Sequence, residues 1–187
     1  SYVGELGYEL YLKTSDSKNI YQKIIEKGKK FNLSNCGMHA LDTMRMESGF
    51  LHWGHDISPE ENQYQAGLNF TISYKKNFNF IGREALEKIK KQKIDKQFLM
   101  LVLKNNEPGK PLLLHDEPIY KDNKIIGRTT SANYSFNFKK NIIFGYVNIG
   151  FGKNELLNEN IYVEVEKTKY PAEIILQPLK KIDFKNS

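Results

Sequence analysis

The run Phe98-Leu99-Met100-Leu101-Val102-Leu103 decides the fold of the second half of this 187-residue chain. Six consecutive apolar residues have the length of a buried β-strand. More short apolar segments follow it, and Lys121-Asp122-Asn123-Lys124 between two of them predicts a hairpin. The expected strands are 98–103, 118–120, 125–130, 142–147, 161–166 and 170–176. Six short strands without a convincing helix predict a small antiparallel barrel or sandwich.

The first 93 residues mix strands with helices, and the pattern changes after Lys93. Apolar and polar residues alternate over 7–13, which predicts a strand with Glu9 and Tyr11 on one face. Caps and helical spacing predict a first helix that starts at 14–17, a second over 38–47, one that begins at Ser58 and one over 83–91. Segments 50–57 and 67–73 are expected to be extended. The chain is therefore expected to be α+β, with one domain over 1–93 and a β-barrel domain over 94–187.

The first two helices carry more detailed expectations. Gly28 lies near the end of the first helix, where a left-handed cap is expected. Gly49 is expected to end the second helix, in which Asp42 and Arg45 form a pair three residues apart. The expected apolar face of the second helix is Met38, Leu41 and Met44.

Composition limits the class of protein. With 40% hydrophobic and 12% aromatic residues, the chain can bury a core, and it contains no apolar run of 18 residues and no charged-then-apolar leader. A soluble cytoplasmic protein with no membrane partner is therefore expected. The net charge of +6 is scattered among acidic residues, and the one dense basic run, 88–93, continues a helical pattern as a solvated face. Nucleic acid is therefore not an expected partner.

Two groups of reactive side chains receive structural interpretations. Cys36 is the only cysteine, which excludes an internal disulfide, and it is expected to be a buried thiol. His52, His55 and Asp56 could bind a metal by residue type, but on an extended chain side chains three residues apart point to opposite faces. No metal site is therefore expected, and these residues are expected to line a cleft or bond within a loop.

Glu9 is the first candidate binding residue. Its carboxylate presents two acceptor oxygens in one plane, which suits a pair of N–H donors on the edge of a ligand. Tyr11 shares its strand face, and Tyr2 lies seven residues earlier. An aromatic ring that stacks and a carboxylate that reads an edge suit a flat heterocycle such as a pterin. An exposed strand carboxylate without a ligand is the alternative interpretation.

The motif Tyr2-Val3-Gly4-Glu5-Leu6-Gly7-Tyr8-Glu9-Leu10 resembles the signature of the folate-binding aminomethyltransferase family, which includes the glycine cleavage T-protein. The stretch 40–49 and the following His52-Trp53-Gly54-His55-Asp56-Ile57 look more like the C-terminal region of dimethylglycine and sarcosine dehydrogenases. Later motifs are similar in the same order, at 66–68, 80–86, 117–120, 126–131 and 145–147. The resemblance covers nearly the whole chain.

The resemblance implies a protein that binds tetrahydrofolate and moves a one-carbon (aminomethyl or methylene) unit onto it from a small-molecule amine donor. Tyr2, Glu9 and Phe70 stand at positions that contact the folate in the family, with the glutamate at the pterin edge. Residues 1–93 would be the C-terminal part of the folate-binding region, and 94–187 the C-terminal β-barrel of the family.

Three departures from the family refine this expectation. The family's catalytic aspartate belongs to an N-terminal segment expected to precede residue 1, so this chain holds no expected catalytic residue and is expected to be inactive without that partner segment. FAD is expected only if a dehydrogenase domain lies upstream. Leu41 replaces an arginine of the T-protein, which favours the dehydrogenase type; a T-protein aminomethyltransferase and a non-catalytic folate-binding module are the alternatives. Residues 183–187 lack the tyrosines that close the T-protein.

Overall fold

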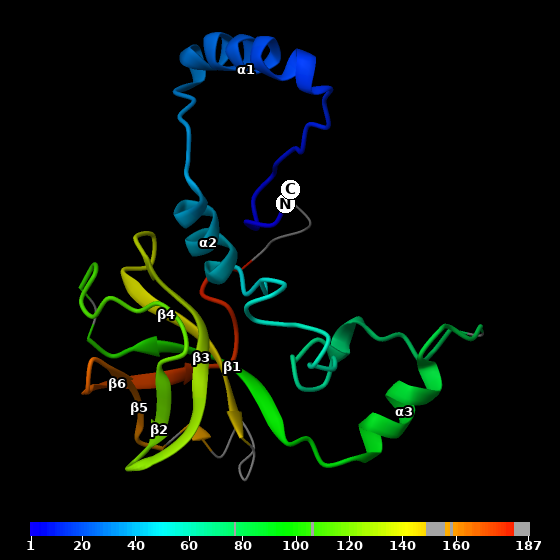
Figure 1. Cartoon of the computed structure of the whole chain (residues 1–187), viewed down its shortest axis with the longest axis vertical. Coiled ribbons are helices and arrows are strands. Elements are labelled where there is room, and N and C mark those ends of the chain that lie inside the picture. Colours follow the sequence, from blue (N-terminus) through cyan, green and yellow to red (C-terminus); the bar gives the residue numbers. More distant parts are fainter. Residues whose placement is uncertain (77, 106, 149–155, 158, 182–187) are drawn as a thin grey trace.

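The computed structural model describes residues 1–76, 78–105, 107–148, 156–157 and 159–181. The second half of this described chain is a closed antiparallel β-barrel, and the first half forms an arch, a helix that joins the arch to the barrel, and a looped segment beside the barrel (Figure 1). The expected α+β class is confirmed. Residues 183–187, to which the expectation about the closing tyrosines applies, lie outside the described ranges.

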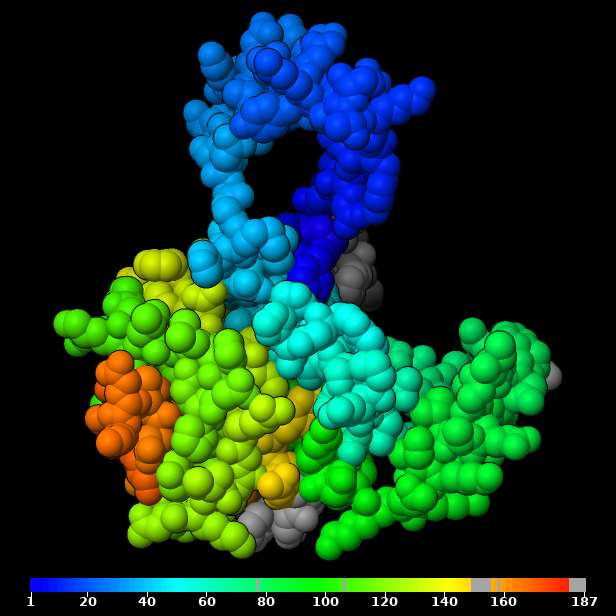
Figure 2. All heavy atoms as spheres, in the orientation of Figure 1, coloured from blue at the N-terminus to red at the C-terminus, as the bar shows by residue number. Residues whose placement is uncertain are grey.

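Helices occur in the first half of the described chain. They are α1 Thr14–Gly28, the 3-10 helix η1 Lys29–Phe31, α2 Met38–Glu47, the 3-10 helix η2 Asn69–Thr71, and α3 Arg83–Lys91. The predicted positions of α1, α2 and α3 are confirmed. Helix α1 crosses the top of the arch and buries none of its side chains, and Figure 2 shows an opening beneath it. Within the described ranges, no helix combines the length and the apolar character needed to cross a bilayer.

The barrel strands match the six predicted from the sequence. They are β1 Lys96–Leu103, β2 Pro118–Lys121, β3 Lys124–Ser135, β4 Lys140–Asn148, β5 Ile161–Val165 and β6 Thr168–Ile175. Their order is β1-β4-β3-β2-β5-β6, and the sheet closes because β6 pairs back onto β1. The predicted hairpin joins β2 to β3, with Asp122 in the left-handed region at its turn.

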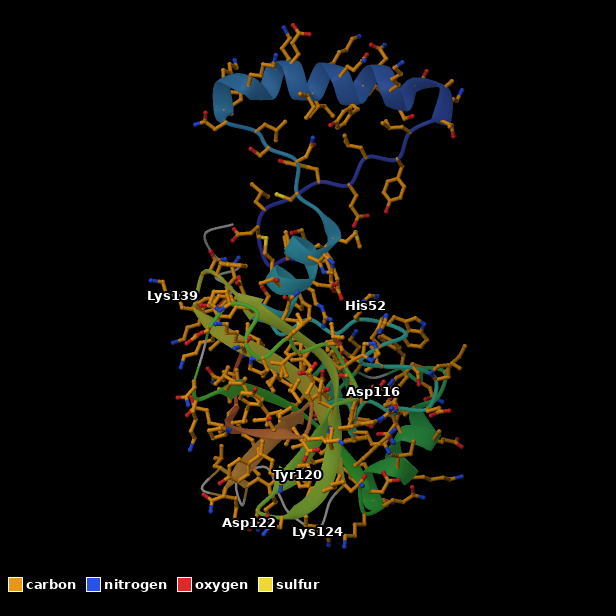
Figure 3. All side chains as sticks on the ribbon, turned by 60° about the vertical axis from the view of Figure 1, so that its left-hand side comes forward. His52, Asp116, Tyr120, Asp122, Lys124 and Lys139 are labelled. Atoms are coloured by element: carbon orange, nitrogen blue, oxygen red, sulfur yellow. The ribbon has the colours of Figure 1, made fainter. Side chains whose placement is uncertain are left out.

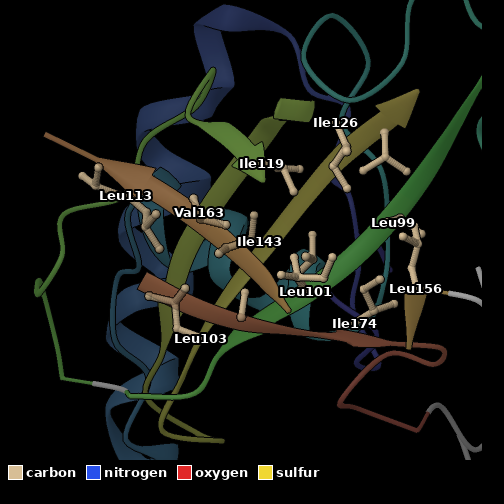
Figure 4. Close-up of a cluster of buried hydrophobic side chains, with 14 residues drawn as sticks. Leu99, Leu101, Leu103, Leu113, Ile119, Ile126, Ile143, Leu156, Val163 and Ile174 are labelled. Carbon is tan, nitrogen blue, oxygen red and sulfur yellow. The ribbon is translucent and has the colours of Figure 1, made fainter. Parts of the chain in front are cut away.

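Two hydrophobic clusters explain why β1 is apolar without alternation. Leu99, Leu101 and Leu103 point into the barrel and join the buried cluster shown in Figure 4. Phe98 lies on the outer face, where it packs with Phe144 and Met46 of α2 in a second cluster. A strand buried on both faces reads as a continuous apolar run. The outer face of the barrel is therefore the surface on which α2 is seated.

Several predicted elements of the first half are wrong. Residues 7–13 and 67–73 form no strand; the first segment has exposed side chains and, within the described chain, no neighbouring strand to bond with, and the second contains η2. A strand is stable only beside a partner. The turn that starts at Ser58 does not become a helix, because Asn62 Oδ1 accepts hydrogen bonds from the backbone N–H groups of Tyr64 and Gln65. Such side-chain bonds compete with helical ones.

Gly28 and Cys36 also differ from expectation. Gly28 is right-handed, and the left-handed residue is Asn32, at the end of η1. Glycine is needed at position 28 for space instead, since a Cβ there would lie 2.3 Å from Leu33 Cδ2. Cys36 is exposed because it lies on the link between η1 and α2, which has little packed against it.

Helix α2 buries a different face from the expected one. Met38 is 69% exposed, and Leu41 and Met44 are half-buried, whereas Arg45, Met46 and Glu47 are buried. The helix packs most tightly against the barrel with its last turn, so the direction of approach decides which residues are buried. Gly49 ends the helix region as expected, with φ 76°.

Truncation of a barrel-core leucine measures what this core contributes. We expect Leu101→Ala to lower the free energy of unfolding by about 2–5 kcal/mol, because it removes buried methyl groups and leaves a cavity. The matched control is Leu112→Ala at an exposed leucine, which should change it by less than about 1 kcal/mol. Urea unfolding of both variants is the measurement, and equal effects would contradict the described core.

Candidate functional site

Tyr2 is attached to the end of the α2 region. Its hydroxyl donates a hydrogen bond to the carbonyl of Leu51 at 2.8 Å, and its ring is stacked with that of Phe50 at a centroid distance of 6.2 Å. Partial burial raises the pKa of the Tyr2 hydroxyl above its usual value. The side chain is still 39% exposed. The ring is therefore held in place and remains partly accessible.

Glu9 lies on the exposed N-terminal arm that climbs from Tyr2 towards α1 (Figure 1). Its carboxylate accepts a hydrogen bond from the Tyr11 hydroxyl, and this bond raises the pKa of Tyr11. The expected proximity of these two side chains is therefore found without the predicted strand. Both side chains are exposed, so the carboxylate remains available to a ligand.

Phe70 lies on η2, in a segment separate from the arm. Its side chain is 79% exposed. Among the described residues, no hydrogen bond or ring contact joins Tyr2, Glu9 and Phe70 to one another. Their roles as folate contacts therefore stay predictions, now with known positions and accessible side chains.

A buried ion pair lies where the helix, the following turn and the barrel meet. Arg45 of α2 and Asp56 are both almost inaccessible to solvent, with Nη1 and Oδ2 2.5 Å apart. Asp56 also accepts hydrogen bonds from the backbone N–H of His52 and from the hydroxyls of Thr130 and Ser131 on β3. Four donors satisfy both carboxylate oxygens, which is the condition for a buried charge to be tolerated.

Arg45 extends the same network in three directions. It donates to the Phe50 carbonyl at 3.1 Å, to Ser131 Oγ at 2.8 Å, and to Asp42 at 3.4 Å. The predicted Asp42–Arg45 pair is confirmed, but the stronger partner of Arg45 is Asp56. Sequence reasoning missed this pair because an arginine next to Met46 carries no periodic signal of burial. The nearest sequence clue was the position of Asp56, directly after His55 and four residues after His52.

Residues 50–57 were expected to be extended, but residues 54–56 form a turn. The histidines gather around this turn. The rings of His52 and His55 lie 4.6 Å apart, and His115 lies 6.4 Å from His55. His115 Nδ1 is 2.9 Å from Asp116 Oδ2, and His52 Nδ1 is 3.8 Å from Asp42. Figure 3 shows His52 and Asp116 on the side where this turn meets the barrel.

All four histidines of the chain line one cavity of about 320 Å³. Metal binding is one use of histidine, but across the part of the chain that the structure describes no three His, Cys, Asp or Glu side chains form a group that could hold a metal ion. The cluster thus lines a cleft, as one of the sequence interpretations proposed.

Removing the charge of Asp56 tests the buried ion pair. We expect Asp56→Asn to lower the free energy of unfolding by about 3–5 kcal/mol, because it leaves the Arg45 guanidinium buried without an anion. Asp42→Asn is the matched control, since that residue is one-third exposed and its contact is long; it should cost about 1 kcal/mol or less. Chemical unfolding measures both, and a cost for Asp56→Asn as small as the control's would exclude the pair as a structural centre.

Comparisons with known proteins agree with the motifs. Residues 1–76 match the family model for the GCVT N-terminal domain, and residues 96–181 match that for the glycine cleavage T-protein C-terminal barrel domain. The crystal structure of glycine cleavage system aminomethyltransferase T from Bartonella henselae aligns with a TM-score of 0.81 at 20% identity, over 97% of this chain and 48% of that chain. That likeness shows the shared fold.

Two curated relatives are similar in sequence. Mitochondrial dimethylglycine dehydrogenase of Rattus norvegicus is 33% identical over 179 residues, which is 96% of this chain and 20% of that protein. An aminomethyltransferase of Symbiobacterium thermophilum is 34% identical over 146 residues, 78% of this chain and 38% of that protein. The chain thus spans well under half the length of either relative. Because the two family models together cover most of its residues, the chain belongs to the glycine cleavage T-protein-like aminomethyltransferase family.

Proposed function

We propose that this chain binds tetrahydrofolate and works in the transfer of a one-carbon unit from an amine to that cofactor. The observation that carries the proposal is the exposed N-terminal arm, on which the carboxylate of Glu9 and the ring of Tyr11 are both accessible and adjacent. This arm forms one side of the opening beneath α1 (Figure 2). A ligand with a flat ring and N–H groups on its edge suits an aromatic face next to a carboxylate. Membership of the family supports tetrahydrofolate as that ligand.

The residues have separate tasks in this proposal. Glu9 accepts hydrogen bonds from the edge of the pterin, and Tyr2 and Phe70 cover its faces. The stacking of Tyr2 on Phe50 and its bond to Leu51 fix that ring before the ligand arrives. Side chains fixed in advance reduce the ordering cost of binding. Tetrahydrofolate, when bound, supplies the nitrogen that takes up the one-carbon unit.

The donor and the partner segment are also part of the proposal. Leu41, where the T-protein has an arginine, favours an N-methyl amine donor of the kind that dimethylglycine or sarcosine represents. The proposed catalytic aspartate lies in an upstream segment of the same protein, in keeping with the small share of each relative that this chain covers. FAD belongs to the proposal only if a flavin-binding domain precedes that segment.

Glu9→Gln tests the proposed pterin contact. In the product of the complete reading frame, we expect it to weaken tetrahydrofolate binding by about 1–3 kcal/mol, because the amide loses one of two acceptor oxygens and the negative charge. Glu26→Gln, at an exposed position of α1, is the matched control and should leave the affinity unchanged. Calorimetric titration measures both, and an unaltered affinity in Glu9→Gln would remove Glu9 from the site.

Turnover separates the transferase from the alternative of a non-catalytic folate-binding module. If the complete protein binds tetrahydrofolate and also consumes an N-methyl amine with one-carbon transfer, the enzymatic proposal stands. Folate binding without any transfer from N-methyl or aminomethyl donors would instead establish the binding module.

A further inference from the structure

A cavity beside the barrel lies apart from the three predicted folate contacts. It has a volume of about 550 Å³ and lies between the turn after His52 and the outer face of the barrel. Strand β1 contributes Lys96, β3 contributes Arg128 and Thr130, and β4 contributes Tyr146. Tyr2, Glu9 and Phe70 do not line it, so a ligand here would be independent of the proposed folate site.

Tyr146 gives this cavity an unsatisfied polar group. Its side chain is 9% exposed, and its buried hydroxyl has no hydrogen-bond partner among the described residues. Burial raises the pKa of this hydroxyl, and the nearby carboxylates of Glu61 and Asp56 raise it further, so the group stays protonated and can donate. A buried hydroxyl without a partner costs free energy, which a ligand in the cavity would recover.

The carboxylates of the cavity already have donors. Asp56 accepts the four hydrogen bonds of the buried network. Glu61 accepts from Lys96 and from the backbone and hydroxyl of Ser58, and these bonds outweigh its burial and lower its pKa. Asp116 is bonded to Arg128 and His115. A ligand therefore gains little by offering donors to this cavity.

The cationic groups have donors to spare. Lys96 has three N–H donors and Arg128 has five, and within the described chain each makes one hydrogen bond, to Glu61 and to Asp116 respectively. The Lys96 ammonium also lies 5.3 Å from the ring centre of Tyr146, which places a positive charge over the ring of this residue. Surplus donors on two cations and a protonated phenol call for an acceptor with negative charge.

We propose that this cavity binds an oxyanion, a carboxylate or a phosphate group, through Tyr146, Lys96 and Arg128. The oxyanion accepts the hydrogen bond that the Tyr146 hydroxyl lacks, while the two cations neutralise its charge. Glu60, an exposed carboxylate in the lining, would repel a ligand whose negative charge extends to that side of the cavity. The proposed ligand therefore carries its charge in one compact group.

Calorimetric titration of the complete protein with inorganic phosphate and with glutarate distinguishes the two sources of the oxyanion. We expect saturable binding of at least one probe, and the tighter one identifies the group. Tyr146→Phe should weaken that binding about tenfold or more, since a hydrogen bond to a charged group is lost. Arg128→Gln, whose side chain is 71% exposed and therefore not needed for folding, should weaken it as well. Tyr162→Phe on β5 is the matched control and should bind like the unaltered protein.

Unfolding without a probe provides the second measurement. Tyr146→Phe should be at least as stable as the unaltered protein, because it removes a buried hydroxyl that has no partner. Two results would overturn the proposal. One is the absence of saturable binding of both probes; the other is unchanged affinity in Tyr146→Phe, which would mean that the hydroxyl serves a water molecule.

Discussion

The buried ion pair between Arg45 and Asp56 is the interaction on which the arrangement of the chain depends. Each residue belongs to a different segment of the first half, and both bond to Ser131 on the barrel. Neither charge could be buried alone, because the cost of removing an ion from water exceeds the gain from packing. The end of α2, the histidine turn and β3 are therefore placed together or not at all.

From this pair the structure reaches the proposed folate contacts in two steps. Arg45 holds the carbonyl of Phe50, and the next carbonyl, that of Leu51, holds the hydroxyl of Tyr2. The N-terminal arm with Glu9 starts from that anchored ring. The oxyanion cavity lies on the other side of the same network, where Asp56 and Thr130 form part of its wall. One buried pair thus supports two separate surfaces with different proposed ligands.

The sequence predicted the barrel well because its signals are local. The apolar run that contains Leu101 predicts a strand, and the residues around Asp122 predict a hairpin turn. Neither prediction depends on any other segment of the chain. The prediction failed where the partner lies far away in the sequence. Arg45 is polar, so no periodicity marks it as buried, and only the position of Asp56 and Ser131 in space makes its burial possible. Residues 7–13 alternate like a strand, yet no neighbouring strand pairs with them in the described chain, so alternation alone misled.

Hydrogen exchange on the complete protein, with and without tetrahydrofolate, tests the central claim most directly. The account predicts that tetrahydrofolate slows exchange of the backbone amides of residues 2–11 and 69–71, because the ligand orders the arm and η2 around itself. Exchange in β1 to β6 should change little. Protection confined to the barrel, with the arm exchanging as fast as before, would contradict the claim that the arm holds the folate.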